Sequence, residues 1–169
     1  MTFKLGVVMD PIGSIAFHKD STLAMLLAAQ ARGWELYYME QSDLFLRDGE
    51  THARTRRLKV ALDPQNWFEF GTETTTPLAA LDAILMRKDP PFNMQYIYTT
   101  TLLERAEARG VLVVNKPQSL RDCNEKLFTA WFPNLTPPTL VTRGAARLRD
   151  FLAEHGDVIL KPLDAMGGA

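Results

Sequence analysis

Short apolar runs and longer amphipathic segments follow one another along the chain. The runs end at turn residues and predict buried strands at 3–9, 34–39, 81–86 and 111–114. Apolar residues at helical spacing predict one helix after the capping residue Asp20 and a second that ends at Gly110. In the second helix, the four-residue spacing of Tyr98, Leu102 and Ala106 predicts the buried face. Strands separated by a helix are parallel. The pattern therefore predicts an α/β fold with a Rossmann-like, mostly parallel sheet flanked by helices.

Two segments interrupt this alternation of strand and helix. Residues 44–47 and 51–60 are predicted to pair as a hairpin, because Asp48-Gly49 tolerates the positive φ angles of a tight turn. Residues 63–77 carry aromatic side chains among polar ones, without a clear period. We interpret them as a surface excursion that covers one edge of the sheet.

The pattern changes after residue 117, and a boundary near residue 122 divides the chain into domains at 1–122 and 123–169. Asn124 is predicted to cap a short helix. The remainder is predicted to form a strand, a helix and a strand at 139–142, 145–154 and 157–161. A sheet needs more strands than these, so we expect the second domain to be the truncated beginning of a larger one.

Composition narrows the function classes. The chain has 169 residues, 46% of them hydrophobic, which is enough for a core, and its formal net charge of -1 gives no field that would hold a nucleic acid. No apolar run approaches the roughly 20 residues that cross a membrane. Cys123 is the single cysteine, so no internal disulfide can form, and we expect a buried or half-buried structural thiol and a cytoplasmic protein. A homo-oligomer is compatible with the sequence.

One candidate for phosphate binding lies near the last residue. Lys161 closes the last predicted strand, and the loop after it contains Gly167-Gly168. Such a loop can present an ammonium group and backbone N–H groups to phosphate oxygens. It lacks the Gly-Lys-Ser/Thr sequence of a P-loop, and a plain turn is the alternative.

The carboxyl edge of the predicted sheet is the second candidate site. Asp10 follows the first strand, and Arg87 and Lys88 follow a later one, at the edge where open α/β folds bind ligands. Arg87 can hold a carboxylate with its planar fork, and Lys88 can add a point charge. The alternative is that these cations pair with Asp10 or Asp89.

The remaining polar residues give weaker indications of a functional site. Lys126 lies beside the apolar face of the short predicted helix, where a lysine usually lays its stem on the core and keeps its ammonium in solvent. The three histidines are isolated in the sequence, so no metal site is predicted.

Four motifs together resemble those of the bacterial glutathione synthetases, in the same order and at similar spacing. They lie at 6–11 (GVVMDP), 86–92 (MRKDPPF), 114–127 (VNKPQSLRDCNEKL) and 159–169 (ILKPLDAMGGA). The resemblance implies a pre-ATP-grasp domain at 1–122 and the beginning of an ATP-grasp domain at 123–169. It also implies a ligase that uses ATP and Mg²⁺ to join γ-glutamylcysteine to glycine through an acyl phosphate.

The resemblance assigns roles to individual residues. Lys126 and Lys161 match the two lysines that grip the nucleotide phosphates, and Gly167 and Gly168 match the loop that folds over them. At the position of the family's Asp-Gly-Met-Gly-Gly, this chain has Ala165, which restricts positive φ. The catalytic residues stay unassigned, and the magnesium ligands are expected in the family's C-terminal part. We therefore expect this chain to be inactive by itself.

Two alternatives remain open from the sequence. One is a non-catalytic Rossmann-type module that binds a ligand at the edge formed by Asp10 and Arg87. The other is an ATP-grasp ligase for a different acid and amine.

Overall fold

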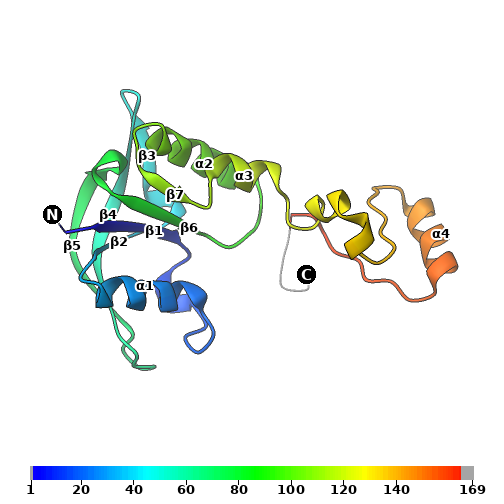
Figure 1. Ribbon diagram of the computed structural model, residues 1–169, viewed down its shortest axis with the longest axis horizontal. Helices are drawn as coiled ribbons and strands as arrows, with labels where there is room; N and C mark the ends of the chain where they lie inside the picture. Colours follow the sequence, from blue (N-terminus) through cyan, green and yellow to red (C-terminus); the bar gives the residue numbers. More distant parts are fainter. Residues whose placement is uncertain (1, 165–169) are drawn as a thin grey trace.

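The computed structural model describes residues 2–164, and a sheet with helices on both faces forms its larger part (Figure 1). Four parallel strands, in the order β2-β1-β6-β7, make up one side of this sheet. They are β1 (Lys4–Met9), β2 (Glu35–Met39), β6 (Ala83–Arg87) and β7 (Leu112–Val114). All four strands predicted from the apolar runs are confirmed.

Helix α1 (Ser21–Ala31) covers one face of the sheet, while α2 (Met94–Glu107) and α3 (Pro117–Asp122) lie on the other (Figure 1). The Asp20 carboxylate accepts a hydrogen bond from the backbone N–H of Leu23 at 2.8 Å, which confirms the predicted N-cap. The crossovers that contain α1 and α2 leave the middle of the sheet in opposite directions, because β2 lies beside β1 and β7 lies beside β6. The strand order therefore reverses between β1 and β6.

Three antiparallel strands complete the sheet. The hairpin of β3 (Leu44–Arg47) and β4 (Glu50–Val60) is confirmed, with positive φ at Asp48 and Gly49. One edge of β4 pairs with β3 and then β2, and the other edge pairs with β5 (Phe68–Pro77). The segment at 63–77 does lie along one edge of the sheet, as predicted, but residues 68–77 form the regular strand β5 there and not a surface excursion. Much of β5 is exposed, so it lacks a strong apolar alternation, and its β-branched threonines are the signal that favours a strand.

The core lies on both faces of the sheet. Val7 packs on the α1 side and Val8 on the α2 side, and both are fully buried, as expected for a central parallel strand. In α2 the predicted face is right only in part, because Ala106 is fully buried but Tyr98 is 56% exposed, and Leu103 is fully buried instead. The buried face of α2 also contains threonines that bond to carbonyls one turn earlier in the helix, namely Thr99 and Thr100. These buried hydroxyls made the face look polar in the sequence.

The C-terminal part of the described chain extends away from the sheet (Figure 1). It contains the 3-10 turns η4 (Phe128–Trp131) and η5 (Pro133–Leu135), and α4 (Ala145–His155), which confirms the helix predicted at 145–154. The strands predicted at 139–142 and 157–161 are absent from the described structure, and Ile159 is 84% exposed. A strand needs a neighbouring strand for its backbone hydrogen bonds, and within residues 2–164 none lies beside these segments.

The register of α2 gives a stability prediction. Leu103→Ala should lower the free energy of unfolding by roughly 2–5 kcal/mol, because it leaves a cavity in a fully buried cluster. The adjacent Leu102, which is only partly buried, is the matched control, and Leu102→Ala should cost less than half as much. Urea denaturation of both variants measures the difference. Equal losses would contradict the observed register.

Candidate functional site

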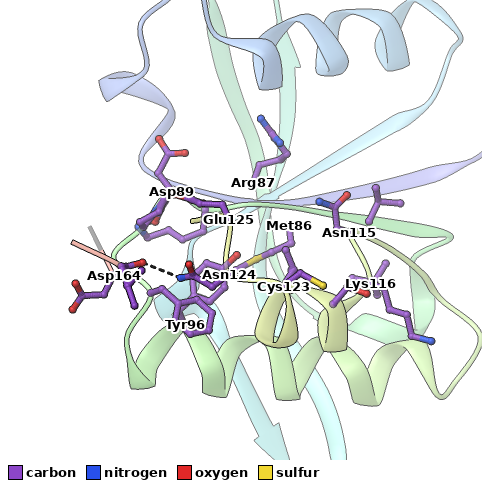
Figure 2. Close-up of a pocket in the computed structure, with 18 residues that line it drawn as sticks. Met86, Arg87, Asp89, Tyr96, Asn115, Lys116, Cys123, Asn124, Glu125 and Asp164 are labelled. Carbon is purple, nitrogen blue, oxygen red and sulfur yellow. Dashed lines mark hydrogen bonds between the residues drawn. The ribbon is translucent and has the colours of Figure 1, made fainter. Parts of the chain in front are cut away.

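The candidate site lies at the carboxyl edge of the parallel strands, where the strand order reverses between β1 and β6. Three cavities open along this edge. The α1 cavity, about 610 Å³, lies between the β1–α1 loop and the end of β6, and the α2 cavity, about 450 Å³, lies between the end of β2 and α2. The β7 cavity, about 540 Å³, lies between the β6–α2 loop, the end of β7 and residues 119–125 (Figure 2).

Asp10 joins the two strands on either side of the reversal. Its Oδ1 forms an ion pair with Lys88 Nζ at 2.9 Å, and its Oδ2 accepts a hydrogen bond from the backbone N–H of Asp89 at 2.9 Å. Lys88 Nζ also donates to the Asp89 carbonyl at 2.6 Å. For Lys88 the ion-pair alternative is therefore the one observed. Asp10 and Lys88 form a brace between the loop after β1 and the loop after β6.

Arg87 has different partners. Its Nε donates to Thr22 Oγ1 and its Nη2 donates to Ser21 Oγ, both at 3.0 Å, so the guanidinium is fixed by two hydroxyls in the first turn of α1. Within residues 2–164, no hydrogen bond joins Nη1 to another residue, and Arg87 forms no ion pair with Asp10 or Asp89. The guanidinium lines the α1 cavity together with Lys19 and Asp20. A charged fork held on one edge only can bind an anion with the other.

The β1–α1 loop is fixed by two aromatic side chains that sequence reasoning did not place at the site. The Tyr38 hydroxyl accepts from the Ile12 N–H at 3.3 Å and donates to Glu40 Oε1 at 2.8 Å, and Trp67 Nε1 donates to the Ile12 carbonyl at 3.2 Å. Burial, reinforced by the Glu40 carboxylate, raises the pKa of Tyr38. The aromatic residues of 63–77 were the available signal for Trp67. Aromatic side chains in a polar segment indicate that residues 63–77 pack against another part of the protein, and the structure shows that Trp67 contacts the loop that lines the α1 cavity.

A turn follows α3 at the border of the two predicted domains. Cys123 is exposed and lines the β7 cavity, so the prediction of a buried or half-buried structural thiol was wrong (Figure 2). Asn124 Oδ1 accepts from the backbone N–H groups of Lys126 at 3.0 Å and Leu127 at 2.9 Å, so it caps a turn at 125–127 and not the predicted helix. The segment that follows is the 3-10 turn η4 rather than an α-helix, and the proline at its end stops it.

The two predicted phosphate-binding lysines lie on segments that contact each other. Lys126 Nζ donates to the Pro162 carbonyl and is 3.9 Å from Glu125 Oε1, and its side chain is only 19% exposed. Lys161 is exposed on the neighbouring segment. Gly167 and Gly168 lie outside the described residues. The structure thus groups Asp10, Arg87 and Lys88 at the sheet edge, and it brings Lys126 to the segment that carries Lys161.

No group of three His, Cys, Asp or Glu side chains in the described range 2–164 could hold a metal ion. These residues therefore do not provide a site for the Mg²⁺ that the resemblance implies. Within the same range, no helix is long and apolar enough to cross a membrane.

The fold is shared with a solved ATP-grasp enzyme. The structure described as the ATP-grasp ligase PsnB complexed with minimal precursor matches 99% of this chain and 56% of its own, with a TM-score of 0.54 and 18% sequence identity. The architecture is therefore that of an α/β domain followed by part of an ATP-grasp domain, as predicted.

Sequence comparisons identify the family within this fold. Residues 3–121 match the prokaryotic glutathione synthetase N-terminal domain, and residues 125–169 match the ATP-grasp domain of the same family. The chain belongs to the prokaryotic glutathione synthetase family. It is 67% identical to the glutathione synthetases of Photorhabdus laumondii and Yersinia pestis and 64% identical to that of Pseudomonas putida, over 98% to 99% of its length. The chain spans about half the length of these relatives, 52% to 53%.

The Tyr38 hydroxyl gives a pH prediction for stability. Because the fold raises its pKa, the unfolded chain releases this proton near pH 10 while the folded protein still holds it. The contribution of the protonated Tyr38 hydroxyl to the free energy of unfolding is therefore complete below about pH 10 and is lost as the pH rises above that value. Tyr38→Phe should flatten this alkaline loss, at a cost of roughly 1 kcal/mol at neutral pH.

Urea denaturation at about pH 8 and above about pH 10 measures this effect. Tyr98→Phe is the matched control, because the Tyr98 side chain is more than half exposed, and it should follow the wild type. An alkaline loss in Tyr38→Phe as steep as in the wild type would exclude the assigned role.

Proposed function

We propose that this chain forms part of an ATP-dependent ligase that joins γ-glutamylcysteine to glycine. The observation that carries the proposal is the 67% sequence identity to glutathione synthetases over 98% of this chain. The geometry supports it, because the lysine-bearing turn at 124–127 contacts the segment at 161–164. The substrates are small molecules. We also propose a cytoplasmic location, since the single cysteine forms no internal disulfide.

The reaction has two steps in this proposal. The terminal carboxylate of the dipeptide attacks the γ-phosphate of ATP, so that an acyl phosphate forms and ADP leaves. The glycine amine then attacks the acyl carbon, the C–N bond forms, and inorganic phosphate leaves as the amine loses its proton. Binding both substrates in line makes each step effectively unimolecular.

Lys126 and Lys161 are proposed to contact the nucleotide phosphates, with Gly167 and Gly168 covering them. Ammonium groups form charge-assisted hydrogen bonds to phosphate oxygens, which are among the stronger polar contacts in proteins. Mg²⁺ would neutralise phosphate charge in such a reaction, but the described residues do not fit a metal site, and we assign none of them to it.

The dipeptide is proposed to bind in the α1 cavity. A dipeptide with two carboxylates and one ammonium needs both signs of charge, and this cavity has Arg87 and Lys19 beside Asp20 and Asp89. Arg87 is the proposed carboxylate clamp, with Nη1 directed to the ligand. Asp10 and Lys88 are proposed to act indirectly, because their mutual ion pair fixes the loop that follows Arg87 at the end of β6.

The clamp role of Arg87 is tested in a protein of the family's length that contains these residues. Arg87→Lys should raise the KM for γ-glutamylcysteine about tenfold or more, because lysine cannot reproduce the planar fork that bonds two hydroxyls and a carboxylate together. The KM for ATP and the melting temperature should change little. If the variant instead loses thermal stability and both KM values stay the same, Arg87 is a structural brace and the dipeptide binds elsewhere.

The phosphate role of Lys126 is tested in the same protein. Lys126→Met keeps the apolar stem and removes the ammonium, and it should weaken ATP binding or slow turnover by about ten- to a hundredfold. Lys59→Met, on the exposed face of β4, is the matched control and should have no effect. Unchanged ATP kinetics in Lys126→Met would show that the family role does not hold at this position.

A further inference from the structure

Three consecutive carbonyls at the end of the described chain are each held by a donor from elsewhere in the sequence. The Pro162 carbonyl accepts from Lys126 Nζ, the Leu163 carbonyl from Asn124 Nδ2 at 2.9 Å, and the Asp164 carbonyl from the Phe92 N–H at 3.2 Å. In a sheet, backbone carbonyls accept such bonds from a neighbouring strand. Here two side chains and one loop amide take that role, a few residues before Gly167 and Gly168 in the sequence.

Asn124 differs from the other two donors because both ends of its amide are used. Its Oδ1 accepts from the N–H groups of Lys126 and Leu127, and its Nδ2 donates to the Leu163 carbonyl. In Figure 2, Asn124 lies beside Asp164, at the side of the β7 cavity opposite Asn115. An amide has one accepting and one donating end, so asparagine fits both tasks. Aspartate has no donor, and the serine hydroxyl lies one bond short of the position of Nδ2, so either residue would retain only the cap.

We propose that Asn124 is a positioning residue for nucleotide binding, an inference that rests on the proposed function. Its amide fixes the backbone of Lys126 relative to residues 161–164, so the segments that carry the two lysines are held together. The Phe92 N–H ties the same segment to the β6–α2 loop, which also carries Asp89 of the Asp10 brace. A frame that is set before the nucleotide arrives lowers the ordering cost of binding.

The test separates the two roles of the Asn124 side chain, which caps the turn through Oδ1 and donates to the Leu163 carbonyl through Nδ2. Asn124→Ser and Asn124→Asp both keep an oxygen that caps the turn, and both remove the donor to the Leu163 carbonyl. In a protein of the family's length, calorimetry with a non-hydrolysable ATP analogue should show about tenfold weaker binding for both variants. The melting temperature and the KM for γ-glutamylcysteine should stay close to wild type.

Asn115→Asp is the charge control, because it adds the same negative charge to the same cavity from its opposite side. It should leave nucleotide affinity within about twofold of wild type. Unchanged affinity in Asn124→Ser and Asn124→Asp would overturn the proposal. So would a loss of affinity that accompanies a large fall in melting temperature, because that result indicates a purely structural residue.

A failure of the proposed function is distinguished from a failure of the Asn124 proposal by an activity assay. A wild-type protein that forms no glutathione from ATP, γ-glutamylcysteine and glycine would refute the ligase assignment. The calorimetric affinities of the Asn124 variants do not depend on turnover, and they still decide the positioning role.

Discussion

The carboxylate of Asp10 is the contact on which the arrangement of the site depends. It lies where the strand order reverses, and its two oxygens hold Lys88 and the N–H of Asp89 just beyond the ends of the paired strands β1 and β6. Parallel strands end at one edge without any turn to join them, so a polar contact has to set the distance between their loops. The position of the β6–α2 loop follows from this bridge, while hydrogen bonds to Ser21 and Thr22 direct Arg87 into the α1 cavity.

The same loop connects the sheet to the second part of the chain. Phe92, a few residues after Asp89, donates to the carbonyl of Asp164, and Asn124 and Lys126 hold the two residues before it. The described C-terminal part otherwise exposes large apolar residues, such as Trp131 and Ile159. Hydrogen bonds from Phe92, Asn124 and Lys126 therefore hold residues 162–164 in place, and apolar burial contributes little to their position.

Much of the parallel core could be predicted from the sequence, because strands such as β1 are apolar on both faces and helices such as α1 have clear caps. The errors have physical causes. The edge strand β5 is largely exposed and so lacks apolar alternation, and α2 buries threonines whose hydroxyls are satisfied within the helix. The strands expected at 139–142 and 157–161 have apolar residues but no pairing partner in the described structure.

The candidate site was predictable in position but not in detail. The ends of β1 and β6 indicated Asp10, Arg87 and Lys88, whereas only the structure shows that Lys88 pairs with Asp10 while Arg87 binds hydroxyls of α1. Tyr38 and Trp67 lie 26 and 55 residues from Ile12, the loop residue that they hold. Local sequence patterns carry no information about contacts at such separations.

The central claim, ligation through an acyl phosphate, is tested most directly by following oxygen from the dipeptide. A protein of the family's length that contains these residues is supplied with ATP, glycine and γ-glutamylcysteine labelled with ¹⁸O in its terminal carboxylate. The account predicts that glutathione forms and that one labelled oxygen appears in the inorganic phosphate released with each molecule. Glutathione formation with unlabelled phosphate, or no glutathione at all, would contradict it.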